Sequence, residues 1–335
     1  MGNLKREISS IVRFCKFYNI YRKDIKQKIY FKRQTLVNQL GIEQDEFVFL
    51  SSTGIGDLYL KLILINGLKK TLNTNKISIG YLKSKHLGVI NLFKNNIYKV
   101  YKLTENEIYL LSEESAKPAL GCISHPYFTI TTFQSIGFNN FTFLDLIKIQ
   151  FNIPLEFNDY TMPNVSQDIE NKVIGNMNLL GIERNKAILI SPNAVSFKPL
   201  SEDFWIKIVD KLLMTNYKVL MLDSTEYFRN HQNDNLICID FPLEEAITIC
   251  EYCGNFIGYR SGFCDLIIST KSRKVIVYRD IINEDKYYDC NEGFSFLKMG
   301  ISNPDNTKEI IYSQNNCKEQ IEEVTNYILD KGNLP

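Results

Sequence analysis

The sequence predicts an α/β fold with two parallel-sheet domains that face a cleft. With 335 residues, the chain is long for a single hydrophobic core and favours two domains. From residue 45 onward, short apolar runs typical of buried strands alternate with segments of helical periodicity. The alternation occurs twice, before and after a segment rich in Pro, Asn and Asp at 151–166. We therefore expect a basic helical segment at 1–40, one domain at 41–158 and a second domain at 159–335.

Composition narrows the class of protein. The 44% hydrophobic and 23% charged residues are ordinary for a globular protein, and no apolar run reaches the roughly 18 residues of a membrane span. The net charge of +1 argues against a nucleic-acid partner. The eight cysteines lack the spacing of a disulfide framework, and the N-terminus lacks a signal-peptide pattern. We therefore expect a cytoplasmic protein with reduced thiols.

Positive charge is concentrated in the first 40 residues, which carry ten Lys or Arg and two acids, a net charge of +8. Apolar residues recur there at helical spacing, at Leu4, Ile8, Ile11, Cys15 and Tyr18. One interpretation is a basic amphipathic helix that rests on the anionic inner face of a membrane. The other is a solvated helix packed on its own domain, and the sequence leaves both open.

The first domain is expected to begin with a strand at 47–52, followed by a helix at 58–72. Short apolar runs after this helix predict further strands, at 76–82, 97–103, 107–111 and 121–130. A predicted helix at 143–149 completes the domain.

The second domain repeats the alternation more clearly. It is expected to begin with a helix at 167–180 and a strand at 187–193 that ends in a polar loop. Ser201 is a good N-cap for the next helix, which carries Glu202 and Asp203 in its first turn and extends to residue 213. The remaining elements are predicted strands at 217–224, 235–241, 255–259 and 274–280, and helices at 243–253, from 265 and at 317–330. Tandem domains of this kind bind ligands beyond the carboxyl ends of their strands.

Three loops follow a strand and precede a helix, and the first of them reads SSTGIGD. Gly54 and Gly56 allow the backbone to approach a ligand closely, and Asp57 adds one carboxylate. The loop lacks the third glycine of a dinucleotide fingerprint and the lysine of a Walker motif. An ordinary turn in which Asp57 caps the helix is the competing interpretation.

The other two loops read SPNAVSFKPLSEDFW and GYRSGFCDL. The first presents small polar residues, Ser191 and Asn193 among them, and Lys198, which together suit a phosphate group. In the second, Arg260, Ser261 and Gly262 stand where a diphosphate could meet the start of a helix. The alternatives are an exposed connecting loop and a structural turn in which Arg260 pairs with a surface acid.

Other candidates are less specific. Cys250 and Cys253 form a C-x-x-C pair on a predicted helix without a second pair nearby, which argues against zinc or redox work. His86, His125 and His231 are the only histidines, and His125 precedes a proline in a loop that could contact an acceptor. The aromatic run at 286–296 either lines a donor pocket or serves packing.

Together the three loops resemble the ADP-heptose:lipopolysaccharide heptosyltransferases, a family of GT-B glycosyltransferases with two Rossmann-like domains. That family has an S-x-x-G-D turn in its N-terminal domain, matched here by SSTGIGD. In its C-terminal domain it has S-P-G-A followed by K-x-W-P, and then D-T-G followed by H-L-A. The corresponding segments here are SPNAVSFKPLSEDFW and RSGFCDL.

The resemblance implies an inverting hexosyl- or heptosyltransferase whose acceptor is a cell-envelope glycan or a lipid-linked molecule. Asp57 would be the general base on the acceptor hydroxyl, and Lys198 would neutralise the departing nucleotide diphosphate. Ser261 and Gly262 would hold its phosphates, and Gly54 and Gly56 would let the donor sugar approach. The nucleotide sugar is then the donor substrate, bound by the C-terminal domain. No metal and no further cofactor are expected, and the sequence has no D-x-D motif.

The sequence also departs from the family pattern. Arg260 replaces the aspartate of D-T-G, Cys264 and Asp265 replace histidine and leucine, and Leu200 replaces the tryptophan of K-x-W-P. The donor therefore does not carry over from the family. A nucleotide-sugar epimerase of the same architecture and a non-catalytic scaffold protein remain alternatives, although Asp57 and Lys198 favour catalysis.

Overall fold

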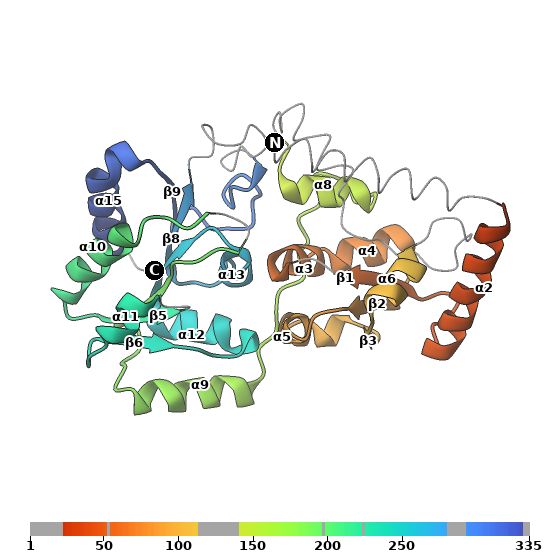
Figure 1. Cartoon of the computed structure of the whole chain (residues 1–335), viewed down its shortest axis with the longest axis horizontal. Coiled ribbons are helices and arrows are strands. Elements are labelled where there is room, and N and C mark those ends of the chain that lie inside the picture. Colours follow the sequence, from red (N-terminus) through yellow and green to blue (C-terminus); the bar gives the residue numbers. More distant parts are fainter. Residues whose placement is uncertain are drawn as a thin grey trace. The chain divides into compact units, whose positions relative to one another are not determined.

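The computed structural model describes residues 23–51, 54–112, 141–195, 198–222, 225–279 and 293–330 (Figure 1). It contains two sheets whose strand pairs are all parallel, which confirms the predicted α/β class. The chain forms two compact units. The first takes its described residues from Met1–Ser52, Thr74–Lys83 and Ile97–His125, and the second from Thr53–Asn73, Ser84–Asn96 and Pro126–Pro335. The domain boundaries expected at residues 40 and 158 stay predictions.

The first unit contains a three-stranded sheet with the order β1 (Phe47–Ser51), β2 (Ile77–Tyr81), β3 (Val100–Lys102). Both β1 and β2 are buried along their whole length, as continuous apolar runs in parallel sheets usually are. The helix α2 (Lys23–Leu40) adds Leu36 and Val37 to a core that also holds Val48 and Leu50. The rest of the predicted basic segment, residues 1–22, lies outside the described residues.

One predicted strand of this unit is wrong. The segment 107–111 belongs to a helix, α6 (Glu105–Ser112). The hydroxyl of Thr104 accepts a hydrogen bond from the Glu107 N–H at 3.3 Å, and the Glu107 carboxylate accepts one from the Thr104 N–H at 2.7 Å. This reciprocal capping starts a helix, and it outweighs the β propensity of the apolar residues that follow. The strand predicted at 121–130 lies outside the described residues.

The second unit contains a six-stranded parallel sheet. Its strands are β4 (Ala187–Ser191), β5 (Lys218–Leu222), β6 (Leu236–Ile239), β7 (Gly254–Tyr259), β8 (Arg273–Arg279) and β9 (Thr307–Tyr312). Their order in the sheet is β6-β5-β4-β7-β8-β9. The chain therefore starts in the middle, builds outward to one edge and returns to build the other half. This is the doubly wound order, whose switch point lies between β4 and β7.

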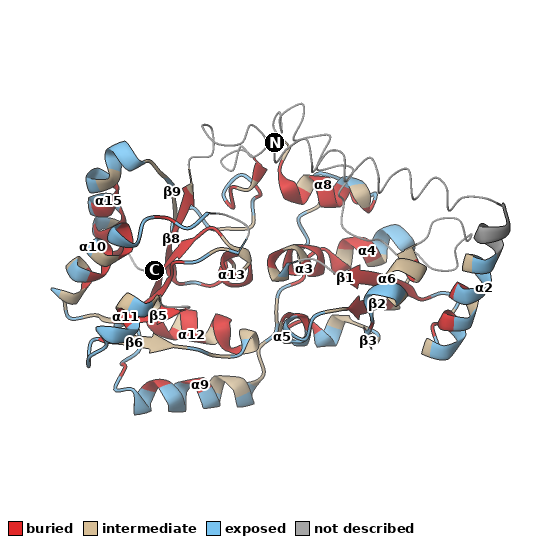
Figure 2. Cartoon of the chain, viewed as in Figure 1, coloured by how far each residue is buried: buried red, intermediate tan, exposed pale blue. Residues whose placement is uncertain are grey.

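Helices cover both faces of this sheet. One core joins Ile188 and Ile190 of β4 to side chains of α10 (Glu202–Leu213), α11 (Glu226–Asn230) and α15 (Cys317–Leu329). On the other face, α12 (Ala246–Cys253) packs on β4 and β7 and against α13 (Gly262–Ile267) and α9 (Gln167–Leu179). With both faces covered, β4, β7 and β8 are buried over almost their whole length (Figure 2). The Ser201 hydroxyl caps α10, as predicted.

The predicted helix at 58–72 is two helices, α3 (Ile55–Leu62) and α4 (Ile65–Leu72). The break occurs where the carbonyl of Ile63 accepts a hydrogen bond from the N–H of Thr161 at 2.7 Å. That carbonyl is engaged by a distant segment at the point where the helix stops.

The second unit also includes α5 (Lys85–Asn91), α8 (Phe143–Gln150) and the short 3-10 helices η1 (Lys94–Asn96), η2 (Leu243–Glu245) and η3 (Gln314–Asn316). None of the helices in the described part of the chain combines the length and apolar character needed to cross a bilayer.

Candidate functional site

The candidate site lies at the switch point of the six-stranded sheet. Ser191 at the end of β4 is in register with Gly258 near the end of β7, so the loops that follow both strands leave the same edge side by side. The hydroxyl of Tyr259, a fully buried side chain, donates a hydrogen bond to the backbone carbonyl of Lys198 at 2.8 Å. The structure thus brings together the two loops predicted to bind the donor.

The residues of the β4–α10 loop differ in exposure. Ser191 is buried, whereas Asn193 and Lys198 are exposed. Residues 196 and 197 lie outside the described residues. The loop therefore presents an amide and an ammonium to solvent at the edge where a doubly wound sheet binds its ligand.

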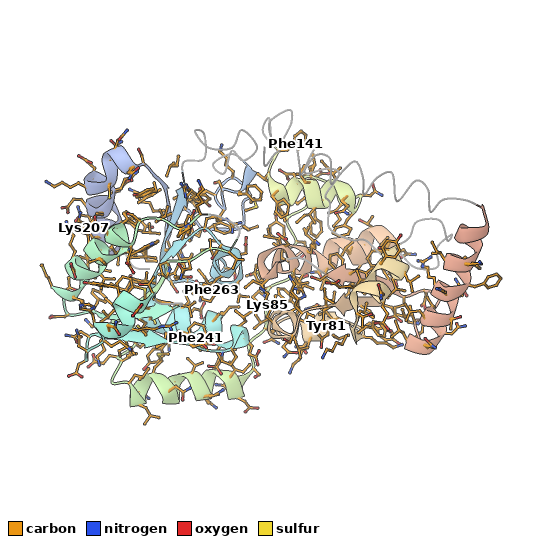
Figure 3. The ribbon with its side chains drawn as sticks, viewed as in Figure 1. Tyr81, Lys85, Phe141, Lys207, Phe241 and Phe263 are labelled. Carbon is orange, nitrogen blue, oxygen red and sulfur yellow. The ribbon has the colours of Figure 1, made fainter. Side chains whose placement is uncertain are left out.

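The helix α13 starts three residues after the end of β7 and is anchored by Phe263, which is labelled in Figure 3. The ring of Phe263 lies 5.9 Å from that of Phe256 on β7 and 6.1 Å from that of Phe241, measured between centroids. These contacts fix the apolar side of α13 and leave Gly262 at its first turn against α3.

The first turns of α3 and α13 touch through two glycines. A Cβ built on Gly56 would lie 2.7 Å from the Cα of Gly262, and a Cβ on Gly262 would lie 2.8 Å from the backbone N of Gly56. The hydroxyls of Tyr59 and Ser269 are also hydrogen-bonded, at 3.1 Å. Because Asp57 follows Gly56, the predicted base is brought to the same place as the two donor loops, half-buried in the first turn of α3.

Arg260 is engaged by several groups. Its Nη1 and Nη2 donate hydrogen bonds to the two carboxylate oxygens of Asp265, each at 2.8 Å, and Nη1 also donates to the Ser261 carbonyl at 2.9 Å. The guanidinium carbon lies 4.2 Å from the centroid of the Phe296 ring. Both members of the ion pair are buried. The sequence left open a pairing with a surface acid, and the observed partner is instead a buried one.

Burial and neighbouring charges together shift the pKa values of Asp265, Arg260 and Lys61. Burial raises the pKa of Asp265 to about 6, the Arg260 guanidinium opposes the rise, and the Asp57 carboxylate adds to it. Burial works to lower the pKa of Arg260, but the Asp265 carboxylate outweighs it and raises that pKa. One helical turn after Asp57, burial lowers the pKa of Lys61 to about 8, against the attraction of Asp57. Asp57 therefore stands among interacting charges.

The remaining candidates that the structure describes are not brought together in one site. Gly54 is exposed at the start of α3, and His125 lies outside the described residues. Cys250 and Cys253 are buried in α12, where burial raises the pKa of each thiol. Among the residues that the structure describes, no group of three His, Cys, Asp or Glu is arranged to hold a metal ion.

The described end of the aromatic run serves packing. Phe294 lies 5.2 Å from Phe143, measured between ring centroids, and Phe296 lies under Arg260. Residues 286–292 lie outside the described residues.

The sequence analysis missed three features of the site. These are Tyr259, Lys61 and the pairing of Asp265 with Arg260. The sequence did contain a signal for the pairing of Asp265 with Arg260, because these two opposite charges flank the start of the short helix α13.

Replacing Gly56 by alanine is expected to lower the free energy of unfolding by about 1–3 kcal/mol, because the new methyl group would meet Asp265 and Gly262. A Cβ on Gly54 would meet only the Asp57 carboxylate, at 3.9 Å. Gly54→Ala is therefore the matched control, with an expected change below about 0.5 kcal/mol. Urea unfolding measures both variants, and equal stabilities would contradict the contact between α3 and α13.

Solved structures share this architecture. A glycosyl transferase family 9 protein from Veillonella parvula is similar with a TM-score of 0.61, at 13% identity, over 86% of this chain and 98% of that chain. The E. coli ADP-heptose lipopolysaccharide heptosyltransferase II gives 0.58 at 11% identity, over 85% and 98% of the two chains. An E. coli heptosyltransferase solved with ADP gives 0.52 at 8% identity, over 84% and 98%.

No family model and no curated protein sequence matches the chain. At identities of 8–13% the likeness shows the fold and leaves the activity to be argued from the site. The resemblance that the three loops indicated is confirmed at that level: the chain has the GT-B fold of the heptosyltransferases.

Proposed function

We propose that the chain is a glycosyltransferase that moves a sugar from a nucleotide-sugar donor to a glycan or lipid-linked acceptor of the cell envelope. The observation that carries the proposal is the meeting of three loops at the switch point between β4 and β7. Doubly wound sheets bind nucleotides at this point. The similarity to glycosyl transferase family 9 and to ADP-heptose heptosyltransferases supports the same reading.

The β4–α10 and β7–α13 loops hold the donor. The exposed ammonium of Lys198 neutralises the diphosphate, which gains negative charge as the sugar leaves. Ser191, Asn193 and Ser261 supply hydroxyl and amide groups for its oxygens, and Gly262 adds a backbone without a side chain. The sequence also made Arg260 a candidate ligand of the diphosphate. In the structure, its Nη1 and Nη2 atoms donate hydrogen bonds to the Asp265 carboxylate.

Asp57 carries out the proton transfer. Its carboxylate accepts the proton of the acceptor hydroxyl while the hydroxyl oxygen attacks the anomeric carbon. The bond from that carbon to the diphosphate oxygen breaks in the same displacement, so the configuration at the carbon inverts. Gly54 keeps the approach open, and His125 is a contact on the acceptor side. The scheme needs no metal ion or cofactor, because Lys198 and backbone N–H groups offset the charge of the leaving group.

Donor binding can be measured by calorimetry with ADP, UDP, GDP and CMP and their sugars. One nucleoside diphosphate is expected to bind selectively, and Lys198→Ala is expected to weaken it about ten- to hundredfold, as for loss of a hydrogen bond to a charged group. Lys207→Ala is the matched control, because Lys207, labelled in Figure 3, is an exposed lysine of α10 that pairs with Asp203. The ADP series comes first, since the similar enzymes use ADP-heptose or were solved with ADP.

The same panel separates binding from chemistry. Asp57→Asn is expected to bind the diphosphate within about twofold of the wild type, because the variant keeps the shape of the site, and to lose transfer by about 10²–10⁴-fold. No binding by the wild type to any member of the panel would overturn the donor site and favour a scaffold protein. Isomerisation of the donor sugar without acceptor would favour an epimerase.

A membrane contact through the basic segment 1–40 is a further part of the proposal. Within α2, Tyr30 and Phe31 are 43% and 60% exposed, and Lys28 and Lys32 beside them are exposed. Exposed aromatic rings among lysines suit the interface of an anionic bilayer. A cytoplasmic protein held in this way on the inner face of the membrane would meet a lipid-linked acceptor there.

Sedimentation with phosphatidylglycerol vesicles and with neutral phosphatidylcholine vesicles tests this contact. Binding to the anionic vesicles is expected to fall about tenfold or more in Lys28→Glu/Lys32→Glu, since each lysine near the surface contributes about 1 kcal/mol. Lys186→Glu/Lys318→Glu, which reverses two exposed charges of the second unit, is the control. Equal binding of both vesicle types by the wild type would contradict the membrane contact.

A further inference from the structure

Asp265 is a buried carboxylate that touches the turn carrying the predicted base. A Cβ built on Gly56 would lie 2.1 Å from Oδ2 of Asp265 and 3.0 Å from its Cγ. No atom larger than hydrogen fits there, so the carboxylate lies directly against the Cα of Gly56. Since Gly56 precedes Asp57 in the first turn of α3, the place of the Asp265 carboxylate limits where Asp57 can sit.

Arg260 holds this carboxylate in one orientation. Two N–H groups of the guanidinium bind the two oxygens at 2.8 Å each, which leaves the carboxylate little freedom to rotate. Arg260 is itself fixed by the Ser261 carbonyl at 2.9 Å and by the Phe296 ring at 4.2 Å. The residues of the pair are only 6% and 3% exposed, so loss of either partner leaves an uncompensated polar group inside the protein.

The ion pair of Arg260 and Asp265 also affects the net charge near Asp57. Two carboxylates, Asp57 and Asp265, are near enough for the charge of Asp57 to act on Asp265. Arg260 offsets one of the two negative charges through its direct pairing. The guanidinium of Arg260 is therefore paired with a buried carboxylate of the protein, whereas the sequence left open either a diphosphate or a surface acid as its partner.

Resting on the proposed function, we propose that Arg260 and Asp265 form a positioning pair for Asp57. Arg260 orients the Asp265 carboxylate, and that carboxylate supports the α3 turn so that Asp57 meets the acceptor hydroxyl. Lys198 remains the cation that meets the diphosphate. Arg260 and Asp265 act through Asp57 and touch neither donor nor acceptor.

The first arm of the test does not depend on activity. Hydrogen exchange of the full chain is measured by mass spectrometry on peptides that span 54–62, in the wild type, Asp265→Ala, Arg260→Gln and Asp265→Asn. Exchange in these peptides is expected to rise about tenfold or more in Asp265→Ala and Arg260→Gln, because the turn loses its support. Asp265→Asn keeps the volume, is expected to fold, and gives a smaller rise. Asp203→Asn, an exposed carboxylate on α10, is the matched control.

The second arm separates positioning from donor binding. In Asp265→Ala and Arg260→Gln, kcat of sugar transfer is expected to fall about 10–100-fold, as for a catalytic group displaced by about 1 Å, while Kd for the nucleoside diphosphate stays within about twofold. Asp265→Asn is expected to restore part of the lost kcat. The double variant is expected to be no worse than the worse single one, because both act through one contact.

Two results would overturn the inference. One is exchange at 54–62 that is unchanged in all variants. The other is a Kd for the diphosphate that rises tenfold in Arg260→Gln but not in Asp265→Ala, which would make Arg260 a donor ligand. Failure of the proposed function is distinguishable from both. In that case the wild type binds no nucleotide, and the exchange arm still shows whether the pair supports the turn of Asp57.

Discussion

The parallel pairing of β4 with β7 is the constraint on which the rest of the site depends. Their paired residues are 67 positions apart in the sequence: Ala187 lies opposite Gly254, and Ser191 lies opposite Gly258. Because the strands run in the same direction, their carboxyl ends share an edge, and both following loops must begin there. The hydrogen bond from Tyr259 to the Lys198 carbonyl then links the longer loop to the end of β7. The donor site that we propose at this edge thus follows from the order of the strands.

The loop SSTGIGD meets the start of α13 through a close backbone contact and a buried carboxylate. The contact between Gly56 and Gly262 brings two backbones nearer than any side chain would allow. The carboxylate of Asp265 fills the space beside that contact and is itself satisfied by Arg260. A buried ion pair of this kind adds little net stability, because both charges lose hydration, but it favours one arrangement over others. The Asp57 turn thus packs against Gly262 and against the carboxylate of a buried ion pair.

The elements that follow from local signals could be predicted from the sequence, and those that depend on distant partners could not. Strands such as β4 and the helix capped by Ser201 were predicted because their patterns are short and continuous. The helix break at Ile63 depends on a backbone bond from Thr161, almost a hundred residues later, and no local pattern reports it. The helix α6 did have a local signal in Thr104, which the apolar run after it obscured. The roles proposed for Asp57 and Lys198 came from resemblance, whereas the support proposed for Asp265 depends on a contact between segments far apart in the chain.

The most direct measurement is a crystal structure of the full chain with the nucleoside diphosphate that binds it most tightly. The diphosphate is expected to lie at the carboxyl ends of β4 and β7, beside Lys198 and Ser261, while Arg260 stays paired with Asp265. A diphosphate bound elsewhere on the chain would contradict the central claim that the switch point of the six-stranded sheet is the donor site.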